Sequence, residues 1–141
     1  MGKLNFETWI SASSGKVWSV LFDEKTYGKW TEVFSAGSTA KTDWKKGSKV
    51  HFLNGTGEGM YALIEENIPQ KFLSIKHLGE VKDGKEGPLQ DWGDAHEDYH
   101  LEEKDGGTLL KVEMGIPEEW REYFEKTWPQ ALETVKSLSE Q

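Results

Sequence analysis

The sequence predicts an α+β fold in which a long C-terminal helix, from Pro117 to about Leu138, packs across the concave face of a curved antiparallel sheet of seven strands. Two observations predict the sheet: apolar and polar residues alternate in several short segments, and turn residues separate those segments. A third observation predicts the helix: apolar residues recur in this segment at spacings of three and four. We expect a single domain over residues 1–141, since this length is close to the commonest domain size.

The chain begins with one strand and two short helices. Leu4–Ile10 alternates apolar and polar residues, which indicates a strand with one buried face. Ser13 or Ser14 is expected to cap a helix over Gly15–Phe22, because a serine hydroxyl accepts from the free amides of a first turn. A second short helix is expected over Asp23–Trp30. Both helices therefore follow the first strand directly.

Six further strands are expected to form a meander. Asn54-Gly55 predicts a turn between two of them, and Asp105-Gly106-Gly107 predicts the tight hairpin before the last. Val81–Gly93 is the one long loop, for which a gate with Trp92 at its end and a disordered segment are both open expectations. The expected strands are Gly37–Thr42, Lys49–Leu53, Gly59–Glu66, Lys71–Glu80, Ala95–Glu103 and Thr108–Ile116.

The last segment has one apolar stripe. Pro117 opens it at a first turn, where a missing amide hydrogen costs nothing. A stripe of this size stabilises the fold only when it is buried, so the helix must pack on the sheet. Its members are Trp120, Tyr123, Phe124, Trp128, Ala131, Leu132, Val135 and Leu138.

Composition excludes several classes of function. The chain has no cysteine, which excludes disulfides, thiolate chemistry and cysteine-based zinc sites. Its net charge of −8 is unsuited to nucleic acid or to an anionic membrane surface, since both need a basic face. No apolar run approaches the length of a membrane helix, so membrane insertion is not expected. The N-terminal residues lack the apolar stretch of a signal peptide, and a cytoplasmic location is expected.

Several motifs resemble one known superfamily. The segment Ile10–Asp23, followed by Tyr27–Thr31, is similar to the entry motif of the helix-grip superfamily, which includes START lipid-transfer domains, polyketide cyclases and birch-pollen-allergen-like proteins (together also called SRPBCC). Within it the chain most resembles homologues of the C-terminal domain of the activator of heat-shock protein 90 ATPase. Further matching segments are Trp44–Gly47, Asn67–Pro69 with Phe72-Leu73, Gly106–Leu110 and Trp128–Val135.

The resemblance implies a cavity between the final helix and the concave face of the sheet. It spans nearly the whole chain and implies a fold more than a function, because the superfamily includes carriers, receptors, cyclases and chaperone activators. A full-length activator carries a second, N-terminal chaperone-binding domain, for which this chain has no room. The co-chaperone role is therefore an alternative to ligand binding.

Seven Trp, six Phe and four Tyr must line a core, a pocket or an interface, because aromatic side chains bury large areas. Solid packing and an open cavity are both compatible with this number. The period of two in a strand places His77 on the face of Ile75, and Glu97 on the face of Tyr99. Both polar residues are therefore expected to point into the interior.

A histidine–carboxylate pair in an apolar cavity has three interpretations. His77 and Glu97 could perform acid–base chemistry, form a structural ion pair, or orient a polar group of a ligand. His96, Asp98 and His100 alternate on one strand with a spacing that can chelate zinc. They lie on the face opposite Tyr99, however, where a solvated polar surface is the simpler expectation.

The sequence contains no nucleophile motif and no phosphate loop, and we expect no cofactor, no metal and no catalytic residue. The leading hypothesis is non-catalytic binding of a small, largely apolar molecule between the final helix and the sheet. One alternative is a protein-interaction module that acts on a chaperone ATPase, and a further alternative is an enzyme of cyclase or dehydratase type. The expected ligand-binding residues are Phe52, Met60, Ile75, His77, Glu97, Tyr99, Trp120, Phe124 and Trp128.

Overall fold

A computed structural model describes residues 2–93 and 95–141 of the chain. Within these residues the helices lie at two places, early in the chain and at its C-terminal end. The strands are β1 (Gly2–Ile10), β2 (Thr39–Lys41), β3 (Lys49–Leu53), β4 (Gly59–Ile68), β5 (Phe72–Lys82), β6 (Lys85–Glu86), β7 (His96–Lys104) and β8 (Gly107–Ile116). The helices are α1 (Ser14–Phe22), α2 (Glu24–Thr31), the 3-10 turn η1 (Glu118–Trp120) and α3 (Arg121–Ser139).

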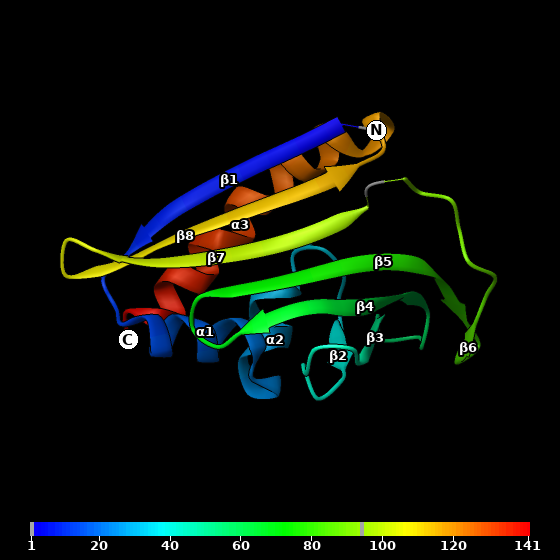
Figure 1. The fold of residues 1–141 in the computed structure, drawn as a ribbon, viewed down its shortest axis with the longest axis horizontal. Helices are drawn as coiled ribbons and strands as arrows, with labels where there is room; N and C mark the ends of the chain where they lie inside the picture. Colours follow the sequence, from blue (N-terminus) through cyan, green and yellow to red (C-terminus); the bar gives the residue numbers. More distant parts are fainter. Residues whose placement is uncertain (1, 94) are drawn as a thin grey trace.

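The strands form one antiparallel sheet in the order β1-β8-β7-β5-β4-β3-β2, with β1 and β2 at its edges (Figure 1). The α+β class, the curved sheet and the long C-terminal helix are confirmed. The described residues hold eight strands where seven were expected. The additional strand, β6, has two residues and pairs with the end of β5. It lies inside the segment that was expected to be one long loop.

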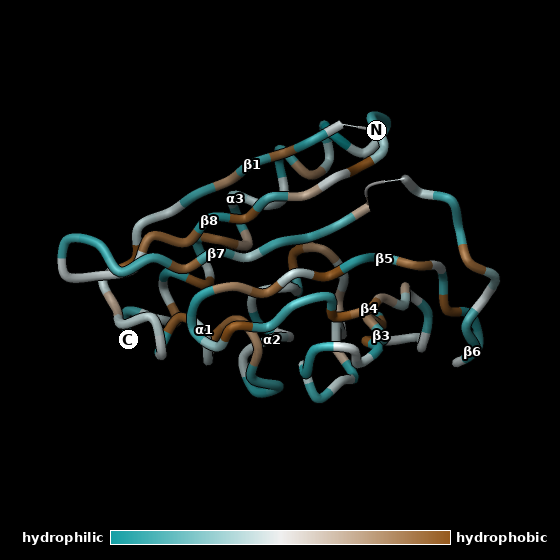
Figure 2. Tube along the Cα trace, viewed as in Figure 1, coloured by the Kyte–Doolittle hydropathy of each residue, from teal (hydrophilic) through white to brown (hydrophobic). Residues whose placement is uncertain are grey.

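Alternation along the strands sets the two faces of the sheet, as Figure 2 shows in the changes of hydropathy along each strand. In β8, Leu110 and Val112 are buried while Lys111 between them is exposed. In β7, Tyr99 is buried and His100 is exposed. The face assignments made from the sequence are therefore confirmed for these two strands.

Two helix caps follow the sequence. Ser13 Oγ accepts a hydrogen bond from the backbone amide of Lys16 at 3.1 Å and begins α1. Asp23 Oδ1 accepts from the amide of Lys25 at 2.8 Å and begins α2. Pro117 differs from the prediction, because its backbone is extended and only a 3-10 turn follows before α3 begins at Arg121.

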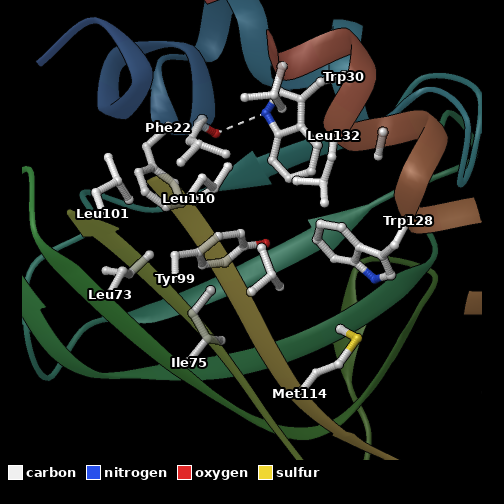
Figure 3. Packing of buried hydrophobic residues seen from close by; sticks show 14 of the residues in the cluster. Phe22, Trp30, Leu73, Ile75, Tyr99, Leu101, Leu110, Met114, Trp128 and Leu132 are labelled. Carbon is white, nitrogen blue, oxygen red and sulfur yellow. Dashed lines mark hydrogen bonds between the residues drawn. The ribbon is translucent and has the colours of Figure 1, made fainter. Parts of the chain in front are cut away.

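The helices lie on one side of the sheet, where α3 contacts β1, α1 and α2. The buried core lies between these helices and the sheet. Figure 3 shows Trp128 and Leu132 pointing from α3 toward sheet residues that include Tyr99 and Met114. No helix among the described residues combines the length and the apolar character needed to cross a membrane.

α3 is attached to the edge strand β1 near both of its ends. Arg121 Nη2 donates to the backbone carbonyl of Lys3 at 3.3 Å. Lys136 Nζ donates to the backbone carbonyl of Trp9 at 2.8 Å. β1 is an edge strand, so these two bonds give polar groups of an open sheet edge a partner on the helix.

Candidate functional site

Three polar side chains meet on the largely apolar inner face of the sheet. His77 Nε2 lies 3.2 Å from Glu97 Oε1, and the hydroxyl of Tyr99 donates to Glu97 Oε2. The side chains of His77 and Glu97 are 13% and 16% exposed, so both are largely withdrawn from water. We call His77, Glu97 and Tyr99 the inner polar cluster. Its members are among the residues predicted from the sequence.

Strand register brings the inner polar cluster together. Glu97 lies opposite Ile75 on β5, and Tyr99 lies opposite Leu73. His77 continues the face of Ile75, so it lies diagonally next to Glu97. An irregularity in the β4–β5 register follows directly after His77, between the pairs made by Tyr61 and Ala62. The alternation that places His77 inside therefore holds up to that residue.

The phenols near Glu97 remain protonated. Burial raises the pKa of Tyr99 well above its usual value, and the nearby charge of Glu97 raises it further. Burial likewise raises the pKa of Tyr27, again with a contribution from Glu97. Tyr99 is therefore a hydrogen-bond donor to the carboxylate over the whole physiological pH range.

Aromatic rings cover the inner polar cluster on the side of α2 and β3. The ring of Phe52 lies 5.7 Å from the ring of His77, and Tyr27 stacks on Phe52 at 6.4 Å. Trp44 lies 6.1 Å from Tyr27 and 6.4 Å from Phe52. Tyr27, Trp44 and Phe52 are each half-buried. His77 is therefore flanked on this side by aromatic rings.

Trp44 is held in a strained conformation. Its φ is +62°, in the left-handed region that non-glycine residues rarely adopt. Asn67 Nδ2 donates to the Trp44 carbonyl at 2.6 Å, and the Trp44 amide donates to Thr42 Oγ1 at 3.1 Å. These two bonds fix the segment between β2 and β3 so that the Trp44 ring reaches Phe52 and Tyr27.

Trp128 fills the middle of the space between α3 and the sheet. Its side chain is only 3% exposed. Its ring lies 5.0 Å from Phe34, 5.9 Å from Trp30 and 6.3 Å from Tyr99, and it stacks on Phe6 at 6.1 Å. Figure 3 shows it between Trp30 and Met114. At this position aromatic packing occupies the space expected for a ligand.

Trp120 and Phe124 lie nearer the surface than Trp128. Trp120 is 50% exposed, and its ring lies 6.2 Å from that of Phe124. Phe124 is half-buried and lies 6.3 Å from Phe34. Tyr123 Oη donates to the Phe34 carbonyl at 3.2 Å. We call Phe34, Trp120, Tyr123 and Phe124 the surface aromatic cluster, which joins the start of α3 to the segment after α2.

The remaining predicted binding residues lie at three depths. Ile75 is 1% exposed and belongs to the core. Phe52 is half-buried beside His77. Met60 pairs with Phe52 across β3 and β4, and it is 39% exposed at the rim of the sheet. The structure thus brings Phe52, His77, Glu97 and Tyr99 together, while Trp120 and Met60 lie at the surface.

Two shallow depressions on the surface lie elsewhere. One follows the outward side of α3 and is lined by Pro129, Gln130, Glu133, Thr134, Ser137 and Leu138. The other is lined by Asp91, Trp92, Gly93, Pro117, Glu118 and Glu119. Neither is lined by any of the nine predicted binding residues. Trp92, at the end of the expected loop, lines the second depression together with Glu118 and Glu119 of η1.

The outer face of β7 holds the three residues considered for zinc. His96 Nε2 lies 3.7 Å from Asp98 Oδ2 and 3.8 Å from Glu113 Oε1, and Ser74 Oγ donates to Asp98 Oδ1 at 2.6 Å. His96 and Asp98 are only 13% and 17% exposed, so this part of the face is less solvated than expected, because neighbouring strands pack around it. Within residues 2–93 and 95–141, no three histidine or acidic side chains gather as metal ligands.

Sequence reasoning missed Tyr27, Trp44 and Phe34 as neighbours of the site. Tyr27 and Trp30 are three residues apart on α2, and their rings lie 5.4 Å apart, so helical spacing was a usable signal for Tyr27. Trp44 and Phe34 lie in irregular segments, where periodicity gives no direction. Their contribution depends on tertiary structure.

The curved antiparallel sheet, the two short helices after β1 and the long C-terminal helix define a helix-grip domain. A family model described as "Activator of Hsp90 ATPase homolog 1-like protein" matches residues 11–140. The chain therefore belongs to that family. A comparison with curated proteins finds no matching relative.

Solved structures agree on the fold. The Aha1 dimer from Colwellia psychrerythraea is similar with a TM-score of 0.73 and 19% identity, over 99% of this chain and 97% of that one. Protein CV1439 from Chromobacterium violaceum is similar with a TM-score of 0.71 and 21% identity, over 100% of this chain and 99% of that one. DynU16, a protein in the dynemicin biosynthetic locus, is similar with a TM-score of 0.72 and 14% identity, over 96% of this chain and 46% of that one.

Proposed function

We propose that this protein binds a small, largely apolar molecule without converting it, with the polar group of the ligand directed at the inner polar cluster. The observation that carries the proposal is a carboxylate and an imidazole on an apolar face, each still 13–16% exposed. Groups of this kind are costly to bury, and their retention inside an apolar layer is typical of a binding site.

The ligand would enter beside Phe52 and Tyr27. Trp128 occupies the centre of the helix–sheet space, so a ligand there would have to displace a fully packed indole ring. Phe52 and Tyr27 are only half-buried, so we infer that these two rings would move to admit a ligand to His77. The occurrence of the similar DynU16 in a biosynthetic locus supports a small molecule as the ligand.

The hydrogen bonds of Glu97 support a role of the inner polar cluster in holding a ligand. Each carboxylate oxygen of Glu97 already has a hydrogen-bonding partner, His77 for one and Tyr99 for the other. Each oxygen keeps a second lone pair, which can accept a hydrogen bond from a ligand. The cluster is therefore suited to orienting the polar group of a bound molecule.

The test is a titration with the neutral fluorescent probe N-phenyl-1-naphthylamine, followed by amide and aromatic NMR shifts. The expected result is saturable fluorescence enhancement, with shifts at Tyr27, Phe52 and His77. Shifts confined to Gln130 and Thr134, on the outward depression of α3, would move the site away from the inner polar cluster. Absence of any saturable signal, together with no co-purifying molecule in native mass spectra, contradicts the proposal.

A second candidate function is interaction with a chaperone ATPase. The observation in its favour is the surface aromatic cluster, in which Trp120 is 50% and Tyr123 is 40% exposed. Exposed aromatic side chains are enriched at protein interfaces. Membership of the activator-like family also supports it. The test is the ATPase rate of a heat-shock protein 90 chaperone with excess protein, compared with the Trp120→Ala variant. An unchanged rate contradicts this candidate.

A further inference from the structure

The hydrogen-bonding capacity of the inner polar cluster is unbalanced. The Glu97 carboxylate has acceptors only, so His77 Nε2 must donate the bond that joins them at 3.2 Å. In the neutral ring with the proton on Nε2, Nδ1 is an acceptor. His77 Nδ1 is buried and has no hydrogen-bond partner. The one phenolic donor of the cluster, Tyr99, is already used by Glu97.

With the imidazole neutral, the unfilled hydrogen-bonding capacity of the inner polar cluster consists of acceptors. His77 Nδ1 offers a lone pair, and each Glu97 oxygen accepts more than one hydrogen bond. A buried acceptor without a partner is costly, and a ligand that supplies a donor removes that cost. A ligand that brings a second carboxylate adds further acceptors and a like charge next to Glu97.

The charges at the surface aromatic cluster also disfavour an anionic ligand. Glu118, Glu119, Glu122 and Glu125 lie exposed along the turns that carry Trp120 and Phe124. Arg121 on these turns is paired with Glu118 at 2.9 Å. The whole chain carries a net charge of −8. An anionic molecule is thus disfavoured at this face and by the net charge of the chain as a whole.

We propose that the ligand of this site is an apolar molecule whose polar group is a neutral or cationic hydrogen-bond donor, and that the site discriminates against carboxylates such as fatty acids. The proposal rests on the proposed function and names the class of its ligand. The donor group bonds to His77 Nδ1 and Glu97, and the apolar body packs against Phe52 and Tyr27.

The experiment compares three probes with the same twelve-carbon chain: 1-dodecanol, dodecylamine and dodecanoate. Each displaces N-phenyl-1-naphthylamine from the full chain at neutral pH, below its aggregation limit. The alcohol and the amine are expected to compete at concentrations about tenfold lower than dodecanoate, a ratio that corresponds to a tenfold difference in Kd. Equal or better competition by dodecanoate overturns the proposal while leaving the proposed function intact.

Two variants sharpen the result. Glu97→Gln removes the charge and adds an amide donor, so dodecanoate competes better and dodecylamine competes less well. Glu102→Gln is the matched control, because Glu102 lies exposed on the outer face of the same strand. If both variants change the order of the probes alike, the discrimination comes from overall charge and the proposal is wrong. Absence of N-phenyl-1-naphthylamine binding to the unaltered chain rejects the proposed function and this inference together.

Discussion

Tyr99 donates its hydroxyl hydrogen bond to Glu97, two residues earlier on the same strand and the same face of β7. The two residues therefore form a pair that needs no other element to bring it together. His77 reaches the same carboxylate from β5. A charged group is thereby kept on an apolar face by one local donor and one donor from the next strand.

Removal of the tyrosine donor should destabilise the fold. In Tyr99→Phe the Glu97 carboxylate loses a partner while the ring packing remains, so the free energy of unfolding should fall by about 1–3 kcal/mol. The matched control is Tyr123→Phe, which removes an exposed hydroxyl and should change it by less than about 0.5 kcal/mol. Urea unfolding followed by circular dichroism measures both. Equal effects would show that the carboxylate does not depend on Tyr99.

Replacement of His77 should separate binding from folding. His77→Ala removes the acceptor that faces the proposed ligand, and binding of N-phenyl-1-naphthylamine should weaken at least about tenfold with the fold retained. His100→Ala is the control, since His100 is exposed on the outer face of β7 next to Phe72. Fluorescence titration and circular dichroism are the measurements. A variant that unfolds instead indicates a structural ion pair with Glu97.

Replacement of Trp128 should destabilise the fold far more than replacement of Trp120, although both residues belong to the apolar stripe of α3 and the turn before it. Trp128→Ala leaves a cavity among four aromatic rings and should lower the free energy of unfolding by about 3–5 kcal/mol. Trp120→Ala removes a half-exposed ring and should cost about 1 kcal/mol or less. Denaturant unfolding of both variants checks this. Similar losses would mean that Trp120 is buried in solution.

Glu86 should make the stability of the fold depend on pH in the acid range. Hydrogen bonds from His51 and then from Lys49 lower the pKa of Glu86 below its usual 4.5. A carboxyl whose pKa is lower in the folded state stabilises the fold above the unfolded pKa, and this stability is lost as the pH falls through the folded pKa. Glu86→Gln should therefore lower Tm slightly near neutral pH and not at all well below pH 4.5.

The effect of Glu86→Gln is expected to be small, about 0–1 kcal/mol, because this ion pair lies at the surface. Glu103→Gln, at an exposed position of β7, serves as the control for the loss of one charge. Thermal unfolding across the acid range measures both variants. A Tm difference that persists unchanged at low pH would contradict the role given to the carboxylate.

Periodicity explains why the inner faces of β7 and β8 could be predicted. In a strand each residue points opposite to its neighbours, so Tyr99 and Val112 had to lie inside once their segments were identified. The same rule placed Glu97 and His77. It would have failed beyond His77, where the β4–β5 register shifts. Such an irregularity has no signature in the residues themselves.

The different depths of Trp120 and Trp128 could not be predicted from the stripe alone. Positions four apart advance by about 400° around a helix, so two such steps turn the direction by about 80°. Trp120 also lies in a 3-10 turn, whose narrower winding changes its direction again. Whether Trp128 fills or borders a cavity depends on the rotamers of Phe34 and Trp30, which belong to other elements.

The strand β6 escaped prediction because two residues are too few to show alternation. It pairs with β5, and its Glu86 also bonds to Lys49 and His51 on β3. Those partners lie more than thirty positions away in the chain. A sequence pattern limited to neighbouring residues does not contain that information.

The attachment of α3 to β1 has a consequence for protein synthesis. The bonds from Arg121 to Lys3 and from Lys136 to Trp9 join positions 118 and 127 residues apart. Translation delivers the first strand long before the helix that completes its edge and covers its apolar face. The native arrangement of this strand therefore forms only after the helix has emerged from the ribosome, and until then the nascent chain depends on transient local structure or on folding helpers to remain out of aggregates.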